Sequence, residues 1–366
     1  MKRILSLATM LVALSYASPA SAELKLGGEA AVRLRDDFGH KTEYGVKIST
    51  EDQYFQYRVR LKPSADLGDG YYFKALLQNE EVAGSWQTIG SNNTEKFNLE
   101  VSQFYFGHNS ENSHWALGRL PLGSFDNPIL DLTLYAIPGN GPQGSKLYAV
   151  DTPIATNHFD RLFGFNYGVK VGDGELNAVL VNFDNSSTIP STGIPPTPDT
   201  VNKGLFNDGY GFTAIYKTSI GDVTIAPQVY VTLTHLADNR SPYSFGAQAF
   251  IPAGKSKVSL SGFYSADRNT YRGSSYDYSG YIFRVKGESG PVLAWVDYNK
   301  STDDKNSKDY NNTFVWAQYK VNVHESATGT FSLTPTIRYR ASRENNSTGA
   351  IDNDLFRTEL YATVTF

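Results

Sequence analysis

The chain has 366 residues, a formal net charge of −4 at pH 7 and no cysteine, which excludes a disulfide framework, a thiolate metal site and a lipoprotein anchor. Its 24 tyrosines and 21 phenylalanines accompany a mean hydropathy of −0.36, a combination typical of a barrel with an aromatic outer belt and a polar lumen. The slightly acidic balance disfavours a nucleic-acid partner.

Residues 1–22 predict a cleaved export signal. Lys2 and Arg3 are followed by an apolar stretch and then by small residues ending at Ala22, the order found in secretory signal peptides. The mature chain would begin at Glu23 and carry 31 basic and 37 acidic residues, a charge of about −6. No later segment has the roughly 18 consecutive apolar residues that a spanning helix needs. We therefore expect an exported protein that is periplasmic, secreted or inserted into the outer membrane as strands.

The mature chain contains about sixteen segments in which apolar and polar residues alternate with period two. In chain order, the predicted strands span residues 24–35, 52–62, 71–79, 95–106, 114–120, 160–171, 175–183, 209–218, 223–234, 243–251, 257–266, 276–286, 292–299, 312–323, 330–341 and 355–366. Short turns, such as 172–174 and 287–290, alternate with longer polar loops, such as 88–94, 185–207 and 301–311. This alternation predicts an antiparallel transmembrane barrel with both termini on the periplasmic side.

The same alternation assigns side chains to faces. In the second predicted strand, Phe55 would face lipid or a neighbouring subunit, whereas Arg58 and Arg60 would face the lumen. A charge on the lipid face costs roughly 2 to 4 kcal/mol near the bilayer midplane, so the assignment is energetically constrained. The predicted strands 175–183 and 292–299 stay ambiguous, because residues 176–181 and 292–296 within them are apolar on both faces.

The last predicted strand alternates up to the final residue. One of its faces carries Phe356, Leu360, Ala362, Val364 and Phe366. Termini of soluble domains usually fray into water, whereas a membrane barrel needs a last strand that faces lipid and pairs with the first. The pattern resembles the C-terminal strand of bacterial outer-membrane β-barrel proteins. The alternatives, a soluble all-β sandwich or a surface-exposed repeat protein, explain neither this ladder nor the alternation of loop lengths.

One connection, residues 121–159, is too long for a simple loop. It contains apolar residues such as Phe125 and Ile137, whose exposure to water would be unfavourable. We therefore expect this connection to fold back onto protein. The strand before it ends in Gly118-Arg119. These features resemble the general bacterial porins, and the resemblance covers the whole mature chain in length, strand count and loop order.

The resemblance implies an all-β fold for residues 23–366, a transmembrane antiparallel β-barrel of about sixteen strands. Residues 121–159 would form a long third extracellular loop that folds into the lumen and narrows the pore. The protein would reside in the bacterial outer membrane, in contact with lipid, as a homotrimer. It would pass small hydrophilic solutes and ions by passive diffusion through a water-filled barrel, without a cofactor, a metal or a catalytic residue.

Basic residues occupy inward positions on strands that are consecutive around such a barrel. This predicted basic wall consists of Arg33, Arg35, Arg58, Arg60, Lys74, Lys96, Arg338, Arg340 and Arg357. Glu29, Glu100 and Glu359 lie among them and would neutralise some of their charge. The constriction-loop acids would be Asp126, Asp131 and Asp151, which porins of this type set opposite a wall of arginines. Such an arrangement would produce a transverse field across the pore, although each charge also fits a simply solvated polar face.

Other functions stay open at this point. A channel on the same fold that selects anions or sugars is one alternative, and a surface receptor or adhesin that uses loops such as 185–207 is another. An outer-membrane hydrolase is disfavoured, because no histidine has the spacing of a catalytic or metal site; the six are His40, His108, His114, His158, His235 and His324, all expected in loops, turns or strand ends. The acidic run 302–309 lacks the frame of an EF-hand calcium loop.

Overall fold

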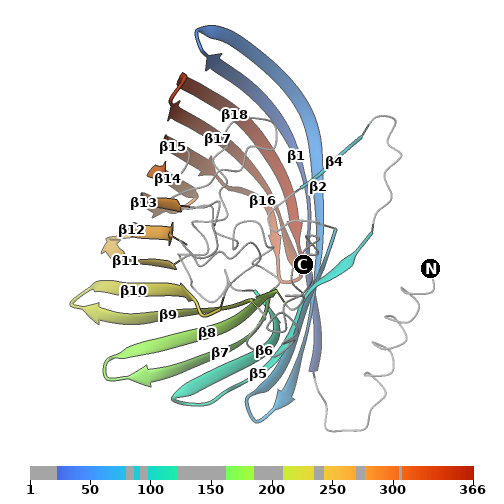
Figure 1. Cartoon of the computed structure of the whole chain (residues 1–366). Coiled ribbons are helices and arrows are strands. Elements are labelled where there is room, and N and C mark those ends of the chain that lie inside the picture. Colours follow the sequence, from blue (N-terminus) through green and yellow to red (C-terminus); the bar gives the residue numbers. More distant parts are fainter. Residues whose placement is uncertain are drawn as a thin grey trace, which may run out of the picture.

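The computed structural model describes residues 23–79, 86–90, 98–121, 162–184, 209–234, 243–268, 277–304 and 307–366. They form one antiparallel sheet that closes on itself (Figure 1). The first strand, β1 (Glu23–Glu43), pairs with β2 (Val46–Gly68) on one side and with the last strand, β18 (Gly349–Thr365), on the other. The closed sheet is therefore a barrel whose seam joins the two ends of the chain.

The remaining strands follow one another around the barrel in chain order. They are β3 (Tyr71–Gln78), β4 (Gln87–Thr88), β5 (Glu100–Asn109), β6 (Ser113–Leu120), β7 (Leu162–Val171), β8 (Gly174–Asp184), β9 (Gly209–Ile220), β10 (Val223–Thr232), β11 (Tyr243–Ala253), β12 (Ser256–Arg268), β13 (Asp277–Ser289), β14 (Val292–Asp303), β15 (Lys308–Tyr319), β16 (Val321–Ser326) and β17 (Gly329–Asn346). Both β3 and the short β4 pair with β2, and both β15 and β16 pair with β17. The 18 described strands thus fill sixteen positions, and the predicted sixteen-stranded antiparallel barrel is confirmed.

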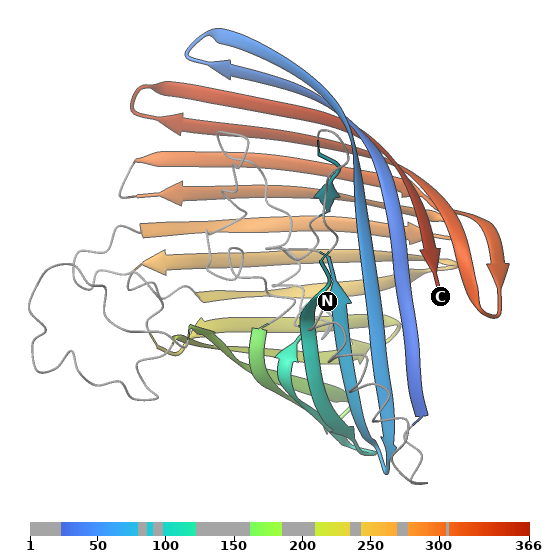
Figure 2. The ribbon, with the colours of Figure 1, turned by 90° about the vertical axis from the view of Figure 1, so that its right-hand side faces the viewer.

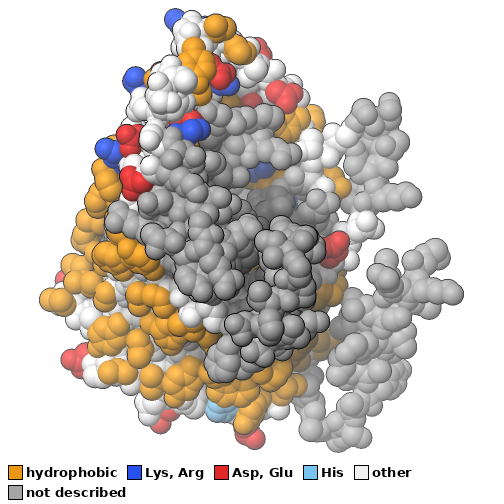
Figure 3. Space-filling model, viewed as in Figure 1, with side chains coloured by type: hydrophobic (Ala, Val, Ile, Leu, Met, Phe, Trp, Pro, Cys, Tyr) orange, Lys and Arg blue, Asp and Glu red, His pale blue; other side chains and the backbone are white. Residues whose placement is uncertain are grey.

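Side chains alternate between the two faces of the barrel wall. Phe55 is 51% exposed on the outside, whereas its neighbour Gln56 is 7% exposed on the inside. The ambiguous segment in β8 resolves in the same way, because Val179 and Val181 are buried inward while Leu180 lies exposed outward. Figure 3 shows hydrophobic side chains spread over the outer surface of the lower strands, with charged side chains gathered near the hairpin tips above.

Two hairpins are much longer than the sequence predicts (Figure 2). Residues 36–51 and 342–354, expected as loops, belong to strands that turn tightly at Tyr44-Gly45 and at residues 347–348. These residues are mostly polar, and scattered apolar residues such as Phe38 and Ile48 do not give the alternation that would mark a strand. Tyr44 and Gly45 have φ values of 48° and 87°, the backbone signs that a two-residue hairpin turn requires.

Polar contacts hold these extensions together. His40, expected in a loop, lies within β1, and its Nδ1 is 3.0 Å from the Ser49 hydroxyl across the hairpin. The Tyr44 hydroxyl is 2.9 Å from the Thr348 hydroxyl, which links the tips of the two long hairpins. The extensions are therefore stabilised by cross-strand hydrogen bonds rather than by an apolar face.

The seam explains the C-terminal ladder. Gly28 donates its backbone N–H to the Phe366 carbonyl at 2.8 Å, and Phe366 donates back to the Gly28 carbonyl at 3.2 Å. A Cβ atom on Gly28 would lie 2.4 Å from the Phe366 ring and 2.9 Å from the Arg60 carbonyl. The last strand thus faces outward and pairs with the first, as predicted, and Gly28 makes room for its terminal ring.

Several predicted features lie outside the described residues: the signal segment 1–22, most of the connection 121–159, Lys96, Asp126, Asp131 and Asp151. Within the described ranges, no helix has both the length and the apolar character needed to cross a membrane. The same ranges contain no cluster of three potential metal-ligating side chains.

Candidate functional site

Arginines on the inner wall surround the carboxylate of Glu359. Arg35 Nη2 and Arg33 Nη1 lie 2.6 and 3.2 Å from its Oε1, and Arg338 Nε lies 2.5 Å from its Oε2. The Tyr361 hydroxyl donates a hydrogen bond of 2.9 Å to Oε2. The side chain of Glu359 is fully covered. One carboxylate therefore lies within ion-pair distance of three guanidinium groups. Arg35 Nε also donates a hydrogen bond of 2.8 Å to its Oε1, and charge-assisted hydrogen bonds of this kind are the strong ones.

Strand register brings these residues together. Arg35 lies directly opposite Glu359 across the seam between β1 and β18, and Arg338 lies opposite Arg357 between β17 and β18. Like charges at directly opposite positions destabilise a sheet. The repulsion is offset here, because Glu359 pairs with Arg338, and Asp37 accepts two hydrogen bonds from Arg357.

A tryptophan lies against this wall. The ring of Trp86 has the guanidinium carbons of Arg33 and Arg58 at 4.3 and 4.5 Å from its centroid, close enough for favourable cation–π contacts. Its segment is held on β2 by a hydrogen bond from Gln56 Nε2 to the Thr88 hydroxyl, 2.9 Å. The sequence reasoning missed Trp86, because it lies in a stretch too short to show alternation.

Aromatic and charged side chains continue the wall away from the seam. The guanidinium carbon of Arg338 lies 3.7 Å from the centroid of the Trp316 ring. The Trp316 ring in turn stacks on that of Trp295, with centroids 4.6 Å apart and an angle of 12° between the ring planes. On β13 and β14, Arg284 donates two hydrogen bonds, 2.6 and 2.7 Å, to the carboxylate of Asp297. The sequence analysis also missed these four residues. Trp295 lies in residues 292–296, where both faces are apolar, and the cross-strand partners of the others are not visible in one sequence.

Five of the nine predicted basic residues meet near the seam. We call Arg33, Arg35, Arg58, Arg338 and Arg357, with the acids Glu29, Asp37 and Glu359, the basic cluster. Glu29 belongs to it because it accepts a 2.8 Å hydrogen bond from Arg58 Nε. The arginines therefore exceed the carboxylates by two charges, and Tyr361 links Arg33 to Arg338 by accepting a hydrogen bond from each.

Of the other four predicted basic residues, Lys96 lies outside the described ranges. Arg60, directly opposite Glu29 in the β1–β2 register, and Arg340, two residues after Arg338 on β17, lie at partly exposed inward positions. Lys74 is exposed on β3, with its ammonium 5.1 Å from the ring centroid of Tyr72. Glu100 is exposed at the start of β5.

The wall half a barrel away is different. In the middle of β7 to β10, the inward positions carry Asn166, Val179, Thr213 and Gln228, all buried and uncharged. The inward charges that are described on these four strands, Lys170, Glu175 and Lys217, lie near the short β7–β8 and β9–β10 turns. The basic cluster therefore has no acidic counterpart at the same height in the described part of β7 to β10.

Comparison with known families agrees with this architecture. Residues 8–366 match the family model of the Gram-negative porins, which is nearly the whole chain. The chain belongs to the Gram-negative porin family. This porin therefore forms a channel in the bacterial outer membrane, as the sequence analysis predicted. Its family and fold are those of channel proteins.

Solved structures share the fold at low sequence identity. The anion-selective porin of Comamonas acidovorans is 11% identical over 94% of this porin and all of its own chain, with a TM-score of 0.53. The outer membrane channel DcaP of Acinetobacter baumannii is 14% identical over 96% of this porin and 99% of its own chain, also with a TM-score of 0.53. A search of curated protein sequences gives no match.

Proposed function

We propose that this porin passes small hydrophilic solutes by diffusion and favours anions over cations. The observation that carries the proposal is the excess of two positive charges in the basic cluster, which lines the inner wall near the seam. A channel wall of one sign raises the local concentration of the opposite ion and excludes ions of its own sign. No catalytic step is part of this proposal.

The surroundings of the cluster support the same sign. The opposite wall on β7 to β10 is uncharged at the same height in its described part, so it supplies no acids that would cancel the field. The predicted constriction-loop acids, Asp126, Asp131 and Asp151, would act against it. If they face the cluster, the anion preference becomes smaller and the transverse field across the gap becomes stronger.

A sugar-selecting channel is less well supported. It would need aromatic rings open to the lumen, but the inward tryptophans Trp86, Trp295 and Trp316 are 9%, 6% and 9% exposed. Rings so covered offer little face for a sugar to slide along. We therefore assign the aromatic side chains a role in holding the arginines in place.

We further propose that the functional unit is a homotrimer embedded in lipid. Outward residues such as Phe55, Phe245 and Phe283 are more than half exposed in the single chain. Apolar surface of this kind is stable against lipid or against a neighbouring subunit. The trimer rests on the resemblance to general porins, and cross-linking of the purified protein in detergent would test it.

The selectivity proposal is tested in a planar bilayer under a KCl gradient. We expect the reversal potential of the wild-type porin to have the sign of chloride preference, and the Arg33→Gln/Arg338→Gln variant to shift it toward potassium. Arg343→Gln is the matched control, because Arg343 is 57% exposed and lies 3.7 Å from Asp352, away from the cluster. A wild-type channel that prefers potassium would contradict the proposal.

A further inference from the structure

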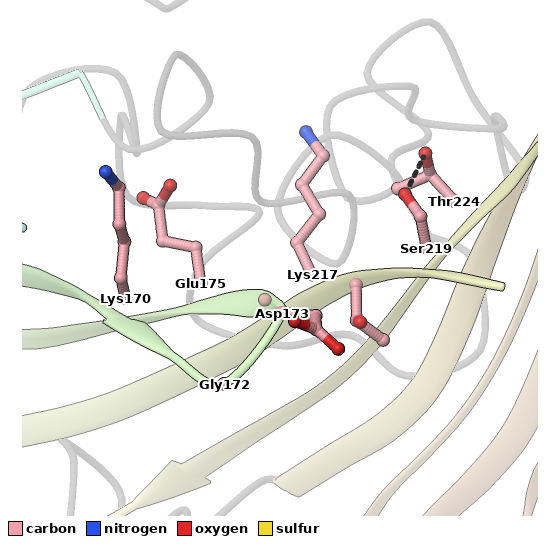
Figure 4. A pocket seen from close by; sticks show the side chains of 9 residues that line it. Lys170, Gly172, Asp173, Glu175, Lys217, Ser219 and Thr224 are labelled. Carbon is pink, nitrogen blue, oxygen red and sulfur yellow. Dashed lines mark hydrogen bonds between the residues drawn. The ribbon is translucent and has the colours of Figure 1, made fainter.

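A row of alternating charge crosses three strands at the periplasmic end of the wall opposite the basic cluster. Lys170 on β7 lies directly opposite Glu175 on β8, and Glu175 lies directly opposite Lys217 on β9. All three alternate with outward residues such as Val171 and Leu176, so they point into the lumen. Figure 4 shows their side chains projecting to the same side of the sheet.

These residues border a cleft of about 400 Å³. Its lining includes the hydroxyl groups of Ser219 and Thr224, which lie 3.3 Å apart on the inner surface of β9 and β10. Asp173 also borders the cleft from the β7–β8 turn, but its carboxylate points away from the two lysines (Figure 4). The inward surface therefore presents two ammonium groups, one carboxylate and two hydroxyls.

The positive character continues along the same rim. Lys217 and Lys257 both lie against the ring of Phe250, at 5.6 and 4.3 Å from its centroid. The ring orients the two ammonium groups by cation–π contact without neutralising either of them. The carboxylate of Glu175 has His114 Nδ1 at 3.7 Å as a further neighbour, so it is not reserved for the lysines.

We infer that this cleft is a second anion site of the channel, which takes the oxyanion group of a small solute, either a phosphate or a carboxylate. Lysines act as mobile point charges toward such groups, and the Ser219 and Thr224 hydroxyls can donate hydrogen bonds to the same oxygens. The negative charge of Glu175, between the two lysines, limits how strongly they attract an anion. Conduction needs sites strong enough for a solute to enter and weak enough for it to leave.

The contribution of the cleft to transport rests on the anion preference proposed above, whereas the binding of an anion in the cleft does not. A solute that passes the basic cluster would meet the cleft before it leaves into the periplasm. Two attractive sites at different heights on opposite walls would form a path along which an anion moves in steps. Binding in the cleft can be measured without reference to the cluster.

Block of the chloride current by inorganic phosphate, added on the periplasmic side, tests the site. We expect saturable block of the wild-type porin, and a half-blocking concentration raised about three- to ten-fold in Lys170→Gln/Lys217→Gln, as the loss of two exposed charge contacts implies. Glu175→Gln should lower it, because the lysines then lack their competing carboxylate. Lys255→Gln, an exposed lysine at the β11–β12 turn, is the control and should leave it unchanged.

The outcomes separate this site from the proposed selectivity. If the wild-type reversal potential shows chloride preference but phosphate block is absent or equal in all variants, the cleft is not an anion site and the selectivity proposal stands. The reverse outcome is a channel that prefers potassium, in which Lys170→Gln/Lys217→Gln raises the half-blocking phosphate concentration and Glu175→Gln lowers it. The anion site is then supported and the selectivity proposal is wrong. A succinate series run in parallel distinguishes carboxylate from phosphate as the better-held group.

Discussion

Two regions of the inner wall differ in the polar side chains that line the lumen. Around the seam, β17, β18, β1 and β2 are the longest strands and carry interlocked arginines and carboxylates. On β7 to β10, the strands are shorter and the buried inward side chains in their middle are amides, hydroxyls and aliphatic groups. Around the seam, acids on neighbouring strands offset the repulsion between the arginines that line the wall.

The largest effect on stability is expected from Glu359→Gln, which removes the carboxylate shared by Arg33, Arg35 and Arg338. Three arginines would then lose their shared carboxylate, and a buried pair broken from one side costs about 3 to 5 kcal/mol. We expect a lower urea midpoint for unfolding of the barrel, together with stronger chloride preference. Glu325→Gln, an exposed acid on β16, serves as the control. An unchanged midpoint would mean that the arginines do not depend on Glu359.

The seam itself is the next point to break, because the basic cluster straddles it. Gly28→Val would push a side chain into the Phe366 ring and the Arg60 carbonyl, and overpacking of this kind costs about 1 to 3 kcal/mol. We expect a smaller fraction of folded barrel on a heat-modifiability gel. Gly287→Val on β13 has open space for its Cβ and should fold like the wild type.

Trp86→Ala tests whether aromatic contact positions the arginines. Removing the ring takes one cation–π partner from each of Arg33 and Arg58, at a cost of about 1 to 2 kcal/mol. We expect noisier single-channel current with the same sign of selectivity, since the charges remain. Steady current at wild-type conductance would assign Trp86 no part in ordering the wall.

Gln228→Glu tests the difference between the charged and the neutral wall, and it has the smallest expected effect on the reversal potential. Gln228 is buried on the neutral wall, 3.4 Å from the Thr213 hydroxyl, and the substitution adds one acid there with almost no change in shape. The reversal potential should move slightly toward potassium, by less than in Arg33→Gln/Arg338→Gln. A shift toward chloride would contradict the proposed field.

Much of this architecture could be predicted from the sequence, because alternation is a local signal. The inward positions of Arg33, Arg35 and Arg58, the strand count and the outward C-terminal ladder all follow from period two. The long hairpins could not be predicted, since residues 36–51 are mostly polar without regular alternation and their pairing depends on hydrogen bonds between strands.

The missed parts of the site have a common cause. Trp86, the Trp295–Trp316 stack and the Arg284–Asp297 pair depend on the register between strands, which a single sequence does not display. The pairing of Arg35 with Glu359 joins residues 324 positions apart. The residue types of the wall were thus predictable, whereas the carboxylate that each arginine would contact was not.

The most direct test of the account is the wild-type reversal potential under a fixed KCl gradient, measured at two mean salt concentrations. At about 0.1 M, where the Debye length is about 10 Å, the basic cluster should give a potential with the sign of chloride preference; near 1 M, where it is about 3 Å, the potential should fall toward zero. A potential with the sign of potassium preference, or one that does not change with salt, would contradict the claim that the net positive charge of the basic cluster sets the selectivity.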